Sequence, residues 1–220
     1  MRAPLRIAVV DYGAGNLRSV ARALEVVGGA PFLTADPLAL REANAIVFPG
    51  QGACGQAMAH LRANGLGEAI VEAVQGGKPF LGVCLGLQLL FCRSEENGVE
   101  CLNILPGVVR RLPRGLVVPH MGWNQVTWKR AHPVWEGIPS GSYFYFVHSY
   151  YPEPSDPALV AGETEYGIPF CSVVAWRSLV ATQFHPEKSG VVGLRLYHNF
   201  LRWAERCLQG EEAYGSHPCH

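Results

Sequence analysis

The pattern of apolar and polar positions divides the chain into two parts that differ in the length and spacing of their apolar runs. In the first part, short apolar runs alternate with longer amphipathic stretches, and glycine or proline separates them. This alternation predicts parallel strands joined by helices that cover both faces of a sheet. The expected strands are residues 5–10, 30–34, 45–48 and 78–83; the expected helices are residues 17–27, a short one capped by Asp36-Pro37, 57–74 with a break near Asn64-Gly65, and 85–91.

The second part favours antiparallel strands. Between residues 108 and 184, turns rich in proline and glycine separate short β-like runs at 117–118, 143–147 and 172–176, and a helix over 191–208 follows. No linker, repeat or low-complexity block separates the two parts. We therefore expect one α/β domain over residues 1–208, with an open, mixed and mainly parallel sheet and helices on both faces. The polar residues 209–220 are expected to be a disordered tail.

Composition excludes several classes of function. The 18 basic and 18 acidic residues cancel, so the chain lacks the basic field of a nucleic-acid-binding protein. No run approaches the roughly 18 apolar residues of a membrane span, and no signal segment is evident at the start. The seven cysteines form no Cys-x-x-Cys motif, which argues against a zinc ribbon. We expect reduced thiols in a cytoplasmic protein that binds neither nucleic acid nor membrane.

The segment Gly82-Val83-Cys84-Leu85-Gly86 lies between an expected strand and an expected helix. It has the Gly-x-nucleophile-x-Gly form of a nucleophile elbow, with cysteine as the nucleophile. The helix N-terminus would favour the thiolate, and the backbone N–H of Leu85 would face a developing oxyanion. The alternative is a buried structural cysteine between two packing glycines.

A general base with an orienting carboxylate is offered by His185-Pro186-Glu187, just after an apolar run. Pro186 stiffens the backbone, so Glu187 can hold one ring nitrogen of His185 while the other faces Cys84. The alternative is an exposed turn. A nucleophile and a base that each follow a strand strengthen the catalytic interpretation of both motifs.

Two glycine-rich loops also follow expected strands. Gly13-Ala14-Gly15 is a weak match to a dinucleotide fingerprint, because Arg18 stands at the position of the third glycine. Pro49-Gly50-Gln51-Gly52 precedes the strand of the elbow, so its backbone can approach Cys84 and supply a second oxyanion donor. An ordinary strand-to-helix turn is the alternative for this loop.

Three motifs occur in a fixed order along the chain: Pro49-Gly50-x-Gly52, Gly82-x-Cys84-x-Gly86-x-Gln88 and His185-x-Glu187. Together they resemble the motifs of the class I, triad-type glutamine amidotransferases. Within that class, the segments 11–16, 119–124, 145–150 and 183–190 are similar to those of the glutaminase subunits of imidazole glycerol phosphate synthases, and the similarity covers nearly the whole chain.

The resemblance implies a glutaminase that converts glutamine to glutamate and ammonia through a cysteine thioester, with no cofactor and no metal. Cys84, His185 and Glu187 would form its catalytic triad. The oxyanion and glutamine sites would be formed by Gly50, Gln51, Gly52, Leu85, Gln88, Ser149 and Tyr150.

The resemblance also implies a heterodimer with a cyclase subunit, a (β/α)8 barrel that uses the ammonia in histidine biosynthesis. The residues that face it would be Asn16, Pro119, His120, Met121, Gly122, Trp123, Asn124 and Lys188. Two alternatives are a glutaminase for another acceptor, as in vitamin B6 or anthranilate synthesis, and a catalytically dead scaffold. The 119–124 segment argues against the first, and the intact Cys, His and Glu argue against the second.

Three positions depart from the pattern of this family. Cys54 stands where an aromatic residue is usual, Leu87 where methionine is usual, and Cys101-Leu102-Asn103 replaces a glycine-rich turn. We expect these to be packing changes that leave the triad intact.

Overall fold

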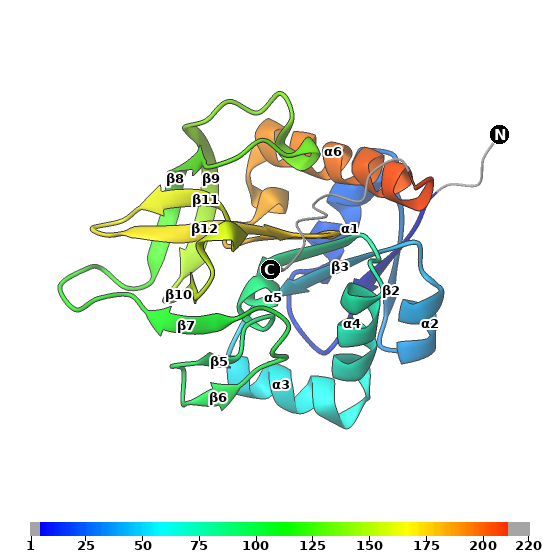
Figure 1. The fold of residues 1–220 in the computed structure, drawn as a ribbon, viewed down its shortest axis with the longest axis horizontal. Helices are drawn as coiled ribbons and strands as arrows, with labels where there is room; N and C mark the ends of the chain where they lie inside the picture. Colours follow the sequence, from blue (N-terminus) through cyan, green and yellow to red (C-terminus); the bar gives the residue numbers. More distant parts are fainter. Residues whose placement is uncertain (1–4, 211–220) are drawn as a thin grey trace.

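The computed structural model describes residues 5–210 of the chain, and within them the apolar runs form a nine-stranded sheet and a smaller four-stranded sheet (Figure 1). The expected tail falls mostly on residues 211–220, which lie outside the described residues. The helices are α1 (Leu17–Val26), α2 (Pro37–Glu42), α3 (Cys54–Ala63), α4 (Leu66–Gln75), α5 (Leu85–Gln88) and α6 (Gly190–Leu208), with 3-10 turns η1 (Pro133–Trp135), η2 (Pro157–Leu159) and η3 (Pro186–Lys188). The strands are β1 (Arg6–Val10), β2 (Ala30–Thr34), β3 (Ala45–Gly50), β4 (Phe80–Cys84), β5 (Arg93–Ser94), β6 (Val99–Glu100), β7 (Gly107–Arg111), β8 (His120–Trp128), β9 (Ser142–His148), β10 (Tyr150–Pro154), β11 (Val160–Glu165), β12 (Pro169–Trp176) and β13 (Leu179–Thr182).

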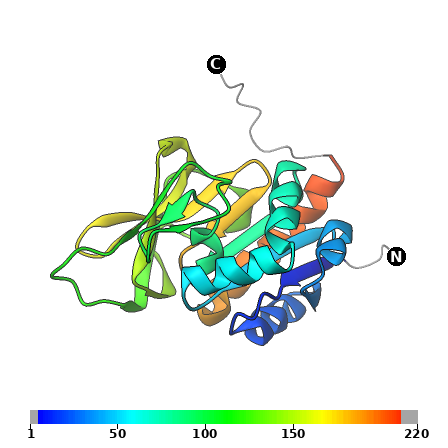
Figure 2. The same cartoon turned by 90° about the horizontal axis from the view of Figure 1, so that it is seen from below.

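The large sheet is parallel in one half and antiparallel in the other. Its strand order is β2-β1-β3-β4-β13-β12-β11-β8-β9. The pairings from β2 to β13 are parallel, and those from β13 to β9 are antiparallel. Figure 2 shows the half that helices cover beside the antiparallel half. The open mixed sheet is therefore confirmed, and its parallel part is confined to the half that contains Cys84.

Helices cover both faces of the parallel half because its strands are apolar on both sides. Along β1, Ala8 and Val10 join the core that includes residues of α2, α3 and α4. Ile7 and Val9 point to the other face and join the core that contains residues of α1 and α6. With both faces buried, only the ends of these strands are open to a substrate. β3, β4 and β13 run in the same direction, so Gly50, Cys84 and the residues after Thr182 meet at one edge of the sheet.

Several boundaries differ from the sequence predictions. The break near Asn64-Gly65 is confirmed, because Gly65 has φ 66° and separates α3 from α4. The predicted helix over 85–91 was too long: α5 ends at Gln88, and the chain then turns away. The predicted run at 117–118 is not a strand, because Val117 is exposed in a loop; the strand β8 begins later, at His120.

Candidate active site

Cys84 occupies a tight turn between β4 and α5. Its φ is 54°, a left-handed conformation that a residue with a side chain adopts only under strain. The flanking glycines are required by packing. A Cβ on Gly86 would lie 1.8 Å from the carbonyl oxygen of Phe48, and one on Gly82 would lie 2.8 Å from Ala181 Cβ. This geometry is that of a nucleophile elbow, and Cys84 is only 7% exposed.

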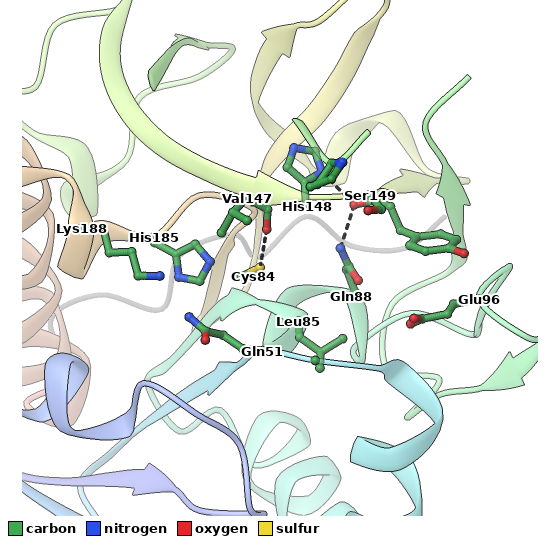
Figure 3. A pocket seen from close by; sticks show the side chains of 13 residues that line it. Gln51, Cys84, Leu85, Gln88, Glu96, Val147, His148, Ser149, His185 and Lys188 are labelled. Carbon is green, nitrogen blue, oxygen red and sulfur yellow. Dashed lines mark hydrogen bonds between the residues drawn. The ribbon is translucent and has the colours of Figure 1, made fainter. Parts of the chain in front are cut away.

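Besides His185, the sulfur of Cys84 has two polar neighbours. Its Sγ lies 3.8 Å from the carbonyl oxygen of Val147 (Figure 3), and Gln183 Nε2 donates to it from 3.7 Å. The helix after Cys84 is a single turn, α5, so its dipole contributes less to a thiolate than the predicted helix over 85–91 would. The buried amide of Gln183 is a more direct source of hydrogen bonding to the sulfur, and the sequence analysis gave it no role.

His185 and Glu187 form a buried pair at the end of the strand β13. Nδ1 of His185 lies 2.7 Å from Oε1 of Glu187, and the side chains are 1% and 0% exposed. The carboxylate is held further by Asn16 Nδ2, 2.5 Å from Oε1, and by the hydroxyl of Tyr197, 3.3 Å from Oε2. Asn16 was predicted to face a partner; the structure places it against the carboxylate of Glu187, where it fixes the orientation of that group.

The remaining nitrogen of His185 is available for proton transfer. Nε2 is buried and makes no hydrogen bond within residues 5–210, and Figure 3 shows the ring beside Cys84. Burial lowers the pKa of His185, but the charge of the Cys84 thiolate, followed by the Glu187 carboxylate, outweighs it and raises the pKa to about 10. Near pH 7 the ring is therefore protonated and can give a proton to the leaving group of an acyl transfer to the Cys84 sulfur.

A cavity of about 400 Å³ opens over Cys84 and His185. Its lining includes the predicted residues Gln51, Gly52, Leu85, Gln88, Ser149 and Tyr150, together with Pro119 and Lys188, which were predicted to face a partner. Gly50 is not part of this lining. It pairs with Cys84 across β3 and β4, and a Cβ there would lie 2.0 Å from the hydroxyl of Tyr12. The cavity also contains Glu96, Val147 and His148, which the sequence analysis did not assign.

Gln88 lines this cavity and is hydrogen-bonded to two other residues. Its Nε2 donates to the carbonyl oxygen of Tyr150 at 2.8 Å and to Oε1 of Gln183 at 3.1 Å. Its amide hydrogens are therefore used on protein atoms. Gln88 fixes the Tyr150 backbone and Gln183, and through Gln183 it is linked to Cys84.

Two buried histidines extend this network towards β8. His148 Nδ1 lies 2.9 Å from the Tyr150 carbonyl and so must donate, which leaves Nε2 to accept from His120 Nδ1 at 2.9 Å. Asn124 Nδ2 then donates to His120 Nε2 at 3.2 Å. Burial lowers the pKa of His148 to about 3 and that of His120 to about 4, so both rings are neutral near pH 7. The predicted position of His120 on a partner surface does not fit this conformation, because its ring is inside the protein.

The rest of the segment 119–124 is accessible. Met121 is 62% exposed and Trp123 is 56% exposed, and Tyr143 on the paired strand β9 is exposed beside them. Lys188 Nζ lies 5.8 Å from the ring centre of Tyr145. These residues form an apolar surface with a cation at its side, next to the mouth of the cavity.

No group of three or more His, Cys, Asp or Glu residues within the described chain has the arrangement of a metal site. Among the same residues, no helix is long and apolar enough to cross a membrane.

The fold and the Cys-His-Glu arrangement define a class of enzyme, and the comparisons agree. The sequence model of the family described as glutamine amidotransferase class-I matches residues 8–202, and the chain belongs to this family. A solved structure titled as a glutamine amidotransferase superposes with TM-score 0.72 at 20% identity, over 90% of this chain and 98% of that one. The structure of PurLQS from Thermotoga maritima superposes with TM-score 0.73 at 19% identity, over 91% and 99%. At these identities the solved structures show the shared fold.

Sequence relatives give a narrower family. A protein of Dehalococcoides mccartyi (strain CBDB1) is 52% identical over 90% of this chain and 97% of its own length, and it is named imidazole glycerol phosphate synthase subunit HisH. A protein of the same name from Aromatoleum aromaticum is 50% identical over 90% of this chain and 98% of its own. Within the class I amidotransferases, the chain belongs to the HisH subunits.

Proposed function

We propose that this subunit hydrolyses glutamine with Cys84 as nucleophile, His185 as acid and base, and Glu187 as the group that orients His185. The observation that carries the proposal is the state of the His185 ring. One nitrogen is fixed by Glu187 at 2.7 Å, and the other is buried without a partner beside Cys84. Buried polar atoms are ordinarily hydrogen-bonded, so a buried ring nitrogen without a partner next to the sulfur supports a role in proton transfer.

The first half of the reaction is acyl transfer to sulfur. The Cys84 thiolate attacks the side-chain carbonyl of glutamine, and the imidazolium of His185 gives its proton to the departing nitrogen, which leaves as ammonia. Glu187 stabilises the charged ring until that transfer. The product is a γ-glutamyl thioester, and neutral His185 then takes a proton from water as the water attacks the thioester, which releases glutamate.

The oxyanion of each tetrahedral intermediate needs donors beside Cys84. The backbone N–H of Leu85 and that of the 50–52 loop are the candidates, since β3 pairs Gly50 with Cys84. Gly52 has φ 99°, and nothing lies within 4 Å of a Cβ placed there. A peptide flip at this position is therefore sterically cheap. We propose that binding of the partner moves this loop into its working position.

The ammonia is passed to a partner cyclase subunit with a (β/α)8 barrel, and the products enter histidine biosynthesis. Ammonia released into neutral water is mostly protonated and loses its nucleophilicity, so a docked acceptor preserves the product. The exposed Met121 and Trp123 beside the mouth of the cavity support this docking surface. We place the complex in the cytoplasm, because Cys54, Cys84, Cys92, Cys101 and Cys171 are thiols, which persist in a reducing compartment.

The experiment is an assay of glutamate release by the purified chain, alone and with the cyclase and its ribonucleotide ligand. Strong stimulation by the liganded cyclase that is absent in Cys84→Ala supports both the chemistry and the partner. No release that depends on Cys84 under any condition overturns the catalytic proposal. Release that is equal with and without the cyclase overturns the proposed movement of the 50–52 loop and assigns the ammonia to another acceptor.

A further inference from the structure

Cys54 and Cys101 are two of the positions that depart from the family pattern, and the structure brings them into contact. They are 47 residues apart in the chain, yet their sulfur atoms lie 3.5 Å apart and share a hydrogen. Cys54 is the first residue of α3, and Cys101 follows β6. Both thiols are buried, with exposed fractions of 0% and 8%. Two cysteines that pack sulfur to sulfur differ from scattered core cysteines, because a bond between them requires a movement of only about 1.5 Å.

A second cavity leads to this pair. It has a volume of about 310 Å³ and is lined by Cys92, Arg93, Glu100, Cys101 and Asn103. It shares no residue with the cavity above Cys84. Cys101 therefore borders a space that a small reagent can enter, whereas Cys54 contacts the Cys101 sulfur but does not line that space. In this arrangement Cys101 reacts first and Cys54 resolves the product.

The hydrogen bond between the two sulfur atoms lowers the pKa for loss of the first proton from the pair and raises the pKa for loss of the second. The hydrogen bond from Cys101 lowers the pKa of Cys54, and the same bond raises the pKa of Cys101, which holds the proton. The negative charge belongs to the pair. It can reach the outer sulfur when the proton crosses the contact to Cys54.

We propose that Cys54 and Cys101 are a modification site at which a hydroperoxide forms a reversible disulfide. Cys101 Sγ attacks the terminal oxygen of the hydroperoxide, the O–O bond breaks, and the alkoxide or hydroxide leaves with a proton. Cys54 Sγ then attacks the resulting sulfenic acid, the S–O bond breaks, and water leaves. In sum, two thiols and one hydroperoxide give a disulfide, one alcohol or water molecule, and one further water molecule. The two sulfur atoms lose two electrons, which the peroxide gains.

The position of Cys54 connects this site to the glutamine cavity. Cys54 follows the 50–52 loop by two residues, and its backbone N–H donates to Glu96 Oε2 at 2.8 Å. Glu96 lines the cavity above Cys84. Closing the sulfur distance from 3.5 Å to the roughly 2.05 Å of a disulfide draws the start of α3 towards residue 101 and strains the loop attached to it. A shift of about 1 Å in an oxyanion loop lowers glutamine hydrolysis by up to about 10²-fold. This consequence rests on the proposed function, whereas the disulfide itself does not.

The test is peptide mapping of the full chain after titration with hydrogen peroxide, quenched with an alkylating reagent and digested with trypsin without reduction. The cleavage sites separate the thiols well: Cys54 falls in peptide 42–62, Cys101 in peptide 94–110, and both Cys84 and Cys92 in peptide 63–93. We expect a linked 42–62/94–110 pair that dithiothreitol separates. The proposal is overturned if Cys54 and Cys101 are still alkylated at a peroxide dose that fully oxidises Cys84. It is also overturned if peptide 63–93 is linked to peptide 94–110.

Cys92→Ser is the matched control, because Cys92 lines the same cavity and must leave the linked pair unchanged. Cys101→Ser must abolish it; if that variant fails to fold, the map of the natural chain still decides. For activity, both the natural chain and Cys101→Ser lose rate through oxidation of Cys84. The natural chain alone shows the additional, dithiothreitol-reversible loss of up to about 10²-fold. Equal losses in the two proteins overturn the link between the disulfide and the glutamine site.

Discussion

Gln183 donates a hydrogen bond from its side-chain amide to the sulfur of Cys84, with Nε2 and Sγ 3.7 Å apart. The same amide accepts from Gln88 through its oxygen. Gln183 is fully buried, so neither contact competes with solvent. The nucleophile is thus held by a residue two positions before the catalytic base in sequence.

Gln183→Leu removes both contacts at nearly constant volume. We expect kcat for glutamine hydrolysis to fall by about tenfold, since a hydrogen bond to a charged group contributes roughly 1.5–3 kcal/mol. Alkylation of Cys84 by iodoacetamide should slow in parallel, which a loss of substrate contacts alone would not cause. Gln209→Leu, at an exposed position, is the matched control. Unchanged alkylation and kcat would show that Gln183 only fills space.

Glu187→Gln removes the charge that orients His185. The pKa of His185 should fall, because the carboxylate is one of the groups that raise it, and the ring loses its fixed orientation. We expect kcat to drop by about 10²–10⁴-fold, the range for loss of general acid–base catalysis, with a smaller change in KM. Glu205→Gln on the exposed side of α6 should leave both parameters unchanged. A loss of kcat of less than threefold would show that Glu187 is not a member of the catalytic triad.

His148 should make the protein sensitive to acid. Its pKa in the folded state is about 3, below the ordinary value near 6.5, so between these values the unfolded chain binds a proton that the folded chain does not. Its contribution to stability is therefore present above pH 6.5 and is lost as the pH falls towards 3. Urea unfolding should show that, between pH 6.5 and 5, the natural chain loses about 1–2 kcal/mol more than His148→Gln.

The exposed His198 provides the control for this measurement, since His198→Gln should keep the pH dependence of the natural chain. Parallel pH profiles for the natural chain and His148→Gln would contradict a neutral, buried His148.

Gly86→Ala should destabilise the fold by about 3 kcal/mol or more, because its Cβ would overlap the carbonyl oxygen of Phe48 at 1.8 Å and the strands cannot separate without breaking the elbow. Gly55→Ala in α3 is the contrasting substitution. Its Cβ meets nothing nearer than 3.5 Å, so alanine should be neutral or stabilise the helix by up to about 1 kcal/mol. Thermal unfolding of both variants measures the difference, and similar melting temperatures would refute the packing requirement at Gly86.

The sequence predicted the parallel half of the fold well because its signals are local. Apolar runs, glycine breaks and the elbow each lie within a few residues, and the Gly65 break between α3 and α4 is an example. The long strand β8 was missed because its apolar residues do not mark its buried face: His120 is buried, whereas Met121 and Trp123 are exposed. Its register against β9 depends on a pairing that no local pattern contains.

The same reasoning explains what was found of the site. Cys84, His185 and Glu187 are recognisable because each stands in a motif with its own geometry. Gln183 and His148 are not, since their roles come from contacts across the sheet: Gln88 lies 95 residues from Gln183, and His120 lies 28 residues from His148. Asn16 contacts Glu187 over 171 residues of sequence, so only the folded chain shows that it serves the triad.

The parallel pairing of β4 with β13 has a consequence for how this fold can diversify. After Cys84 the chain forms nearly all of the antiparallel half. It then forms β13, the strand next to β4, and His185 follows the end of β13. The intervening segment is anchored at both ends by neighbouring strands. Insertions, deletions or exchange of surface within it can therefore change what docks on the protein while the distance between nucleophile and base stays the same. The reaction can therefore be kept while the partner that uses its product changes.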